Sequence, residues 1–190
     1  EKLADMHYDE LLERAAASVN WSRSDARWLK RNSSQDKQSP LRRGKGLALV
    51  IKATITPSTS AAALKINEDG SLNVLTSSVE LGQGAKTVLA QIAASAMQVP
   101  LARVSVSDPD TDLTPYDQQT SSSRTTYSMG GAISKAADDL KRQVVEHAAE
   151  LLEVSLNDLV LEEGRVMVRG SPSRSISYGE VALPTNQGNL

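Results

Sequence analysis

The chain has 190 residues, among them no cysteine, no phenylalanine and only two histidines, His7 and His147. Without cysteine it can form no disulfide, no thiolate zinc site, no cysteine-ligated iron–sulfur cluster and no thiol nucleophile. His147 lies between Glu146 and Glu150 on an expected helix, which favours a surface position, and His7 has no evident partner. We therefore expect this chain to contribute neither metal ligands nor a nucleophile–base pair.

Aromatic residues make up 3% of the chain, so the sequence predicts a core of Val, Leu, Ile, Ala and Met. With 21 Lys and Arg against 23 Asp and Glu, the charge argues against a dedicated nucleic-acid binder. No apolar run reaches the length of a membrane span, and no signal-peptide pattern opens the chain. The expected location is the cytoplasm, with the periplasm left open. Glu1 in place of methionine indicates a processed chain or a piece of a longer protein.

Hydrophobic periodicity predicts an α+β fold, in which a mixed sheet built from β-hairpins packs with two or more helices. Helices are expected over residues 9–19, 85–97 and 130–152, and strands over 47–55, 62–67, 71–79, 103–107, 159–161 and 165–168. Residues 108–128 are polar, lack periodicity and are expected to form a loop. The predicted organisation is an N-terminal helix and basic linker (1–46), an α+β domain (47–183) and a tail (184–190).

The first candidate site is the turn Gly82-Gln83-Gly84, which a strand enters and a helix leaves. The first turn of a helix presents unpaired N–H groups and a positive dipole end, which favour anions. The two glycines let a ligand approach the backbone, and the Gln83 amide offers both a donor and an acceptor. The alternative is a tight strand-to-helix connection that simply requires glycine, and the spacing by itself favours this alternative.

The second candidate is the polar run from Thr120 through Ser122, Ser123, Arg124 and Thr125. Its hydroxyls, backbone amides and guanidinium suit a phosphate or a polyfunctional ring. The alternative is a flexible polar loop. The run precedes the long helix that opens near residue 130, so two polar loops, each leading into a helix, can converge on one anionic heterocycle.

Several separated motifs, in this order, resemble the molybdopterin-binding large subunit of the xanthine dehydrogenase / aldehyde oxidase family. They are Val79-Glu80-Leu81-Gly82-Gln83-Gly84, Thr87, Gln91-Ile92-Ala93, Val99-Pro100, Asp110-Thr111-Asp112, Thr114-Pro115-Tyr116-Asp117, Ser122-Ser123-Arg124-Thr125 and Gly130-Gly131-Ala132. The strong part of the resemblance covers about residues 79–140, and the flanks 9–73 and 151–181 are compatible with it.

The resemblance implies a molybdenum ion held by the dithiolene sulfurs of molybdopterin, commonly in its cytosine dinucleotide form. It places Gly82, Gln83 and Gly84 beside the cofactor. It further implies hydrogen bonds to the pterin and its phosphate from a second group of residues: Thr120, Ser122, Ser123, Arg124 and Thr125.

The family hydroxylates an aldehyde or an N-heteroaromatic carbon with oxygen from water, and electrons leave through iron–sulfur and flavin centres. These centres are expected on partner subunits or domains. The family's late glutamate motif is absent, because Glu180 stands in a different context. The family subunit is several-fold longer, so the chain is expected to be an inactive fragment that needs the remainder of the large subunit and iron–sulfur and flavin subunits.

Two other functions remain open from the residues. One is a stand-alone nucleotide- or phosphate-binding module without redox chemistry. The other is an interaction domain that uses the basic stretch 23–45 to bind an acidic partner.

Overall fold

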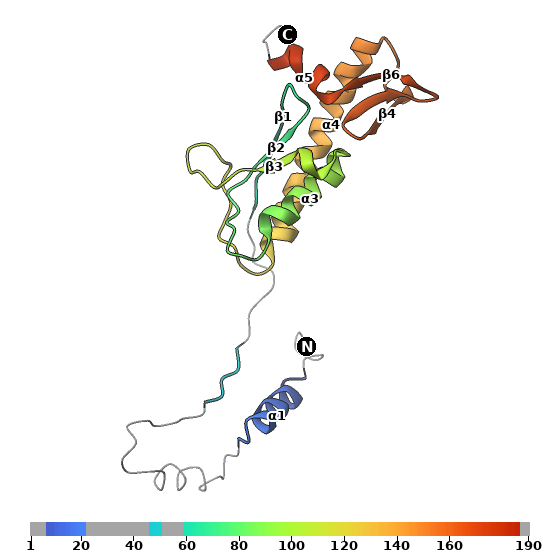
Figure 1. Cartoon of the computed structure of the whole chain (residues 1–190). Coiled ribbons are helices and arrows are strands. Elements are labelled where there is room, and N and C mark those ends of the chain that lie inside the picture. The colour runs from blue at the N-terminus through green and yellow to red at the C-terminus, as the bar shows by residue number, and fades with distance from the viewer. Residues whose placement is uncertain (1–6, 22–45, 51–58, 187–190) are drawn as a thin grey trace, which may run out of the picture. The chain divides into compact units, whose positions relative to one another are not determined.

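The computed structural model describes residues 7–21, 46–50 and 59–186 (Figure 1). The chain forms two units, residues 1–52 and 53–190, and each is described by itself. The first unit contains helix α1, Tyr8–Ser18, which confirms the helix expected over 9–19. Residues 46–50 are irregular where a strand was expected to begin, so the strand prediction is wrong for 47–50, and its remainder lies outside the described residues. The basic stretch 23–45 also lies outside them.

The second unit begins with a three-stranded sheet of order β1-β2-β3. Strands β1 (Ala63–Ile66) and β2 (Leu72–Leu75) form an antiparallel hairpin, as expected. The strand expected over 71–79 ends at Leu75, so the prediction is wrong for residues 76–79. Its turn is fixed by Asp69, whose carboxylate accepts a hydrogen bond from the Ser71 amide at 2.8 Å. Strand β3 (Val104–Val106) lies parallel to β2, a pairing that the sequence analysis did not predict.

Helix α3, Ala85–Met97, makes the crossover between the parallel strands β2 and β3, and its bounds match the expected helix. Both strands therefore end at the same edge of the sheet. The segments that follow them, residues 76–84 and 107–124, start side by side. These two segments carry both candidate sites.

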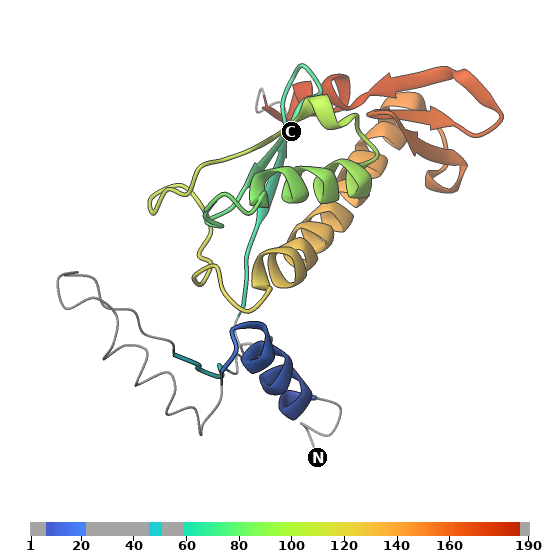
Figure 2. The same cartoon turned by 60° about the horizontal axis from the view of Figure 1, so that its bottom comes forward.

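Helix α4, Gly130–Leu152, is preceded by a π-helical turn, Thr125–Met129. The expected loop over 108–128 is wrong at its end, because residues 125–128 already belong to this turn. Figure 1 and Figure 2 both show α3 beside α4. A Cβ on Gly130 would lie 2.8 Å from Ile92 Cδ1, so a glycine at this position allows the two helices to approach.

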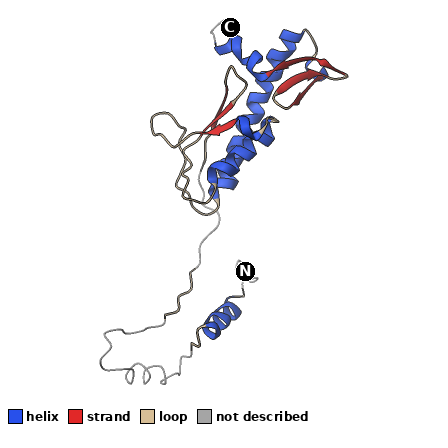
Figure 3. Ribbon diagram, in the orientation of Figure 1, coloured by secondary structure: helices blue, strands red, loops and turns tan. Residues whose placement is uncertain are grey.

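The second sheet is antiparallel and consists of β4 (Leu159–Glu162), β5 (Arg165–Val168) and β6 (Ser171–Ser177). The hairpin β4–β5 confirms the prediction. Strand β6 and helix α5 (Tyr178–Asn186) were missed, and α5 extends into the segment expected to be a tail. The two small sheets and their helices confirm the α+β class (Figure 3).

The core lies among the first sheet, α3 and α4, where Leu72, Leu89, Met97 and Ile133 are buried. The expected core composition omitted Tyr178, which is 1% exposed and donates a hydrogen bond from its hydroxyl to the Met97 carbonyl at 2.9 Å. Burial raises the pKa of Tyr178 to about 12. In the described part of the chain, no helix combines the length and apolar character required of a membrane span.

Candidate cofactor-binding site

The site is built from two loops that leave the same edge of the first sheet. We call residues 76–84, which lead from β2 to α3, the first loop, and residues 107–124, which follow β3, the second loop. The Val79 carbonyl joins them, because it accepts hydrogen bonds from Gln83 Nε2 at 2.9 Å and from Thr120 Oγ1 at 3.4 Å. The structure thus brings together Gln83 and Thr120, one from each candidate motif.

The Gln83 side chain is exposed yet held in one orientation. Its Oε1 accepts a hydrogen bond from the Leu81 amide at 2.5 Å, while its Nε2 donates to Val79. A carboxamide has two N–H donors and two lone pairs on oxygen. One N–H and one lone pair therefore remain available to a ligand in a fixed direction.

Gly82 and Gly84 have φ angles of 95° and 82°, which L side chains rarely adopt. A Cβ at either position would meet no atom within 4 Å. The backbone conformation, and not lack of space, therefore requires glycine here. The open space also allows a ligand to come close to the main chain, as expected from the sequence.

Glu80 occupies the amides that the sequence analysis left free for an anion. Its Oε1 accepts hydrogen bonds from the Gly82 and Gly84 amides at 2.8 and 3.0 Å, and its Oε2 accepts one from the Lys86 amide at 3.1 Å. These bonds, led by those from Lys86 and Gly84, hold the pKa of Glu80 below its ordinary value. The expectation of an open anion site at the start of α3 is therefore wrong, because the chain's own carboxylate fills it.

The second loop contains two consecutive residues, Ser122 and Ser123, with φ angles of 53° and 61°. The next residue, Arg124, returns to the right-handed helical conformation. Left-handed and right-handed residues in succession direct neighbouring N–H groups into one concave face that suits anions. Among the described residues, the amides of Ser122 and Ser123 find no hydrogen-bond acceptor. The exposed Ser123 hydroxyl adds a further donor, whereas the Ser122 hydroxyl shares a hydrogen bond with the Ser121 hydroxyl at 3.3 Å.

Arg124 faces inward and is 3% exposed. Its Nη atoms donate to three carbonyls and two side chains: Thr59 O, Gln118 O, Gln119 O, Ser60 Oγ and Asp117 Oδ1, at 2.9–3.3 Å. The structure therefore does not bring its guanidinium to the ligand side with Ser122 and Ser123. Thr125, the last residue of the expected set, is partly buried and opens the π-helical turn.

Sequence reasoning missed two acidic residues that build the site, Glu80 and Asp117. Glu80 carried a usable signal, since a carboxylate shortly before a glycine-rich turn and a helix can cap the amides of that turn. Asp117 belongs to a motif of the resemblance, but nothing local indicated its role, because its contacts to Ser60 and Arg124 depend on the fold.

The donors present fit molybdopterin. The first loop offers an oriented carboxamide under open space, which suits the edge of a polar heterocycle, and the second loop offers amides and hydroxyls without a positive side chain at the surface, which suit a phosphate group. No cluster of three or more His, Asp or Glu side chains within the described residues could hold a metal ion.

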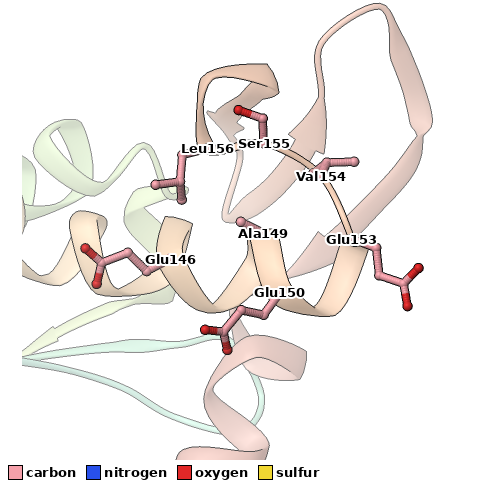
Figure 4. Close-up of a pocket in the computed structure, with 7 residues that line it drawn as sticks. All are labelled: Glu146, Ala149, Glu150, Glu153, Val154, Ser155 and Leu156. Atoms are coloured by element: carbon pink, nitrogen blue, oxygen red, sulfur yellow. The ribbon is translucent and has the colours of Figure 1, made fainter.

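A separate hollow of about 500 Å³ lies at the C-terminal end of α4 (Figure 4). Its lining includes Glu146, Glu150 and Glu153. The opposite end of α4, at Gly130, is separated from the second loop only by the π-helical turn, and a helix of 23 residues spans about 34 Å. An anionic cofactor is repelled by three carboxylates, so this hollow is not part of the candidate site.

Comparison with known proteins places these features in a family. Residues 14–190 match the molybdopterin cofactor-binding domain. The putative xanthine dehydrogenase molybdenum-binding subunit XdhA of Escherichia coli is 34% identical over 172 residues, which cover 88% of this chain and 22% of that subunit. The nicotine 6-hydroxylase large subunit of Paenarthrobacter nicotinovorans is 33% identical over 122 residues, which cover 64% and 15%.

Solved structures agree with the sequence matches. Quinoline 2-oxidoreductase from Pseudomonas putida superimposes with a TM-score of 0.60 at 34% identity, covering 70% of this chain and 17% of that one. Carbon monoxide dehydrogenase from Oligotropha carboxidovorans gives 0.61 at 31% identity, covering 67% and 16%. The chain spans about a fifth of the length of the curated relatives it matches. With its match over residues 14–190, the chain belongs to the molybdopterin cofactor-binding domain family of the xanthine dehydrogenase-type molybdenum oxidoreductases.

Proposed function

We propose that this chain is the part of a molybdenum hydroxylase that binds molybdopterin between the first and second loops. The observation that carries the proposal is the Val79 carbonyl, which accepts from both Gln83 and Thr120 and so fixes the two loops against each other. A ligand that spans both loops meets donors already held in place, so little ordering free energy is lost on binding.

Each loop has its own part in binding. The first loop presents the free N–H and lone pair of Gln83 to the ring edge of the pterin. The second loop presents the amides and hydroxyls of Ser122 and Ser123 to phosphate oxygens. Several donors in one loop suit a diphosphate better than a single phosphate, which favours the cytosine dinucleotide form of the cofactor.

When bound, molybdopterin supplies the molybdenum centre at which an aldehyde or an N-heteroaromatic carbon is hydroxylated with oxygen from water. The residues of this chain bind and orient the cofactor, and none is assigned a proton-transfer role. We further propose a cytoplasmic complex in which the remainder of the large subunit completes the enzyme and iron–sulfur and flavin subunits accept electrons. The relatives' names, which include a molybdenum-binding subunit and a subunit gamma of a dehydrogenase complex, support such an assembly.

Cofactor retention tests this proposal. The chain is purified from a host that makes both molybdopterin and its cytosine dinucleotide, and the pterin, molybdenum and released cytidine monophosphate are measured per polypeptide. We expect bound pterin in the unaltered chain and a loss of about tenfold in Gln83→Ala and in Ser123→Ala, since each removes a hydrogen bond to a charged or polar ligand. Matched controls are Gln143→Ala on α4 and Ser95→Ala on α3, both exposed and outside the loops.

Two outcomes contradict the proposal. Pterin absent from the unaltered chain is one, and equal loss in the site and control variants is the other. Binding of simple nucleotides without pterin would favour the second candidate function, a stand-alone nucleotide-binding module. The amides of Ser122 and Ser123 suit the phosphate of a simple nucleotide as well as that of a pterin, so the test includes the nucleotide-binding module.

A further inference from the structure

Asp117 and Arg124 form a buried ion pair beneath the second loop. Asp117 Oδ1 lies 3.0 Å from Arg124 Nη2, and each side chain is 3% exposed. Ser60 belongs to the same network, because its hydroxyl donates to Asp117 Oδ1 at 2.7 Å and accepts from Arg124 at 3.0 Å. Burial of two charges is costly unless both are paired and hydrogen-bonded, as they are here. A buried ion pair in a loop indicates a structural role, distinct from the ligand contacts that the exposed polar groups of the loop can make.

The pair supports the strained part of the second loop. Left-handed conformations at Ser122 and Ser123 cost on the order of 1–3 kcal/mol each and persist only where the surroundings impose them. Arg124 follows these serines directly and donates to the carbonyls of Gln118 and Gln119, which precede them. The guanidinium therefore holds the chain on both sides of the two serines.

The same pair reaches the first loop through Ser78. The Ser78 hydroxyl donates to Asp117 Oδ2 at 3.1 Å, and Ser78 is 4% exposed. Asp117 thus accepts from Arg124 with one oxygen and from the first loop with the other. A second contact between the loops is the Val79 carbonyl, which accepts hydrogen bonds from both Thr120 and Gln83.

We propose that Asp117 and Arg124 are a positioning pair, which sets the spacing of the two loops and keeps the Ser122 and Ser123 amides directed at the ligand. Arg124 acts through these amides and does not itself contact the cofactor. The effect on cofactor binding rests on the proposed function, whereas the effect on the loops does not.

Amide hydrogen exchange on the full chain tests the pair without any cofactor. We expect Arg124→Gln to raise exchange rates by about tenfold or more over residues 118–126, because an unpaired Asp117 remains buried. Rates over residues 78–84 should rise as well, through Ser78. The matched control is Arg142→Gln, which removes two exposed ion pairs on α4, to Asp139 and Glu146, and should leave both loops unchanged.

Two further variants keep the test decisive if Arg124→Gln fails to fold. Ser78→Ala removes only the contact to the first loop and should raise exchange about fivefold over residues 78–84, with residues 118–126 unchanged. Arg124→Lys keeps the charge but loses the planar fork that reaches several acceptors at once. It should loosen residues 118–126 and lose pterin as Arg124→Gln does.

Full pterin retention in Arg124→Lys together with loss in Arg124→Gln would overturn the proposal, because it would mean that the charge itself contacts the cofactor. Exchange unchanged at both loops in Arg124→Gln, or raised evenly over the whole domain, would overturn it too. If the loops respond as expected but the unaltered chain binds no pterin, the positioning role of the pair holds and the proposed function fails.

Discussion

The first and second loops both direct polar groups toward the candidate cofactor site, but different interactions hold each loop in its conformation. In the first loop, glycines supply the left-handed conformations, and the half-buried carboxylate of Glu80 accepts hydrogen bonds from their amides. In the second loop, two serines adopt such conformations and a buried ion pair holds them from inside. The left-handed conformations of the first loop cost little free energy, because glycine adopts them readily. Those of the second loop are strained, and the buried ion pair maintains them. The two loops should therefore respond differently to mutation and to pH.

The largest difference is expected for the acidic residue of each loop. Asp117→Asn keeps the shape of the side chain but removes the carboxylate that pairs with the buried Arg124 guanidinium, which costs about 3–5 kcal/mol of unfolding free energy. Glu80→Gln at neutral pH should have a much smaller effect, since Glu80 is solvent-screened. Urea unfolding of both variants measures the difference.

The control for this comparison is Asp139→Asn, which removes an exposed partner of Arg142 on α4. Its unfolding midpoint should stay close to that of the unaltered chain. If Asp117→Asn costs no more than Asp139→Asn, the second loop does not depend on its buried pair, and the contrast between the loops fails.

The next effect concerns the glycines of the first loop. Gly84→Ala meets no steric obstacle, so its cost is conformational, about 1–2 kcal/mol for a φ of 82°. Gly131→Ala provides a matched control in α4, where the Cβ also meets nothing within 4 Å but the conformation is helical. It should stabilise the chain by about 0.5–1 kcal/mol. Equal signs for the two variants, measured by thermal or urea unfolding, would contradict this explanation.

The sequence predicts the parts of the fold that depend on local pattern. Helix α3 shows a clear apolar face, so its bounds follow from neighbouring residues. The two hairpins carry a glycine at the turn, so their existence follows from local sequence, although β2 ends at Leu75, before the end of the expected strand. Strand β6 was missed because Pro172, Ser173 and Arg174 are exposed and only Ile176 is a large apolar residue in it. Its place beside β5 comes from tertiary pairing and not from alternation.

The residues of the candidate site also divide into those that local sequence predicts and those that depend on the fold. Gln83 and its glycines are recognisable because turn chemistry is local. Arg124 was expected to meet the cofactor, since an arginine among serines resembles a phosphate contact, yet its partner Ser60 lies 64 residues away in the chain. Burial of a charged side chain by a distant segment leaves no pattern in the sequence near it.

The smallest effect, and the one that separates the loops most cleanly, is the titration of Glu80. Hydrogen bonds from the Lys86, Gly84 and Gly82 amides favour its charged form and hold its pKa below the ordinary 4.5. Because the pKa in the folded state is depressed, the stabilisation from Glu80 is complete above pH 4.5 and is lost as pH falls through the lower folded value. The amide resonances of Gly82 and Gly84 should therefore shift together below pH 4.5.

Glu80→Gln should abolish that titration, since a carboxamide stays neutral over the whole range. Glu162→Gln, an exposed change on β4, should leave it intact. A shift of the Gly84 amide that is centred above pH 4.5, or that survives in Glu80→Gln, would show that another group holds the turn. The expected result identifies the first loop as the one that acid releases before the fold is lost. Glu80 is only half-buried, and within the part of the chain that the structure describes its carboxylate accepts hydrogen bonds only from the amides of its own turn and of α3.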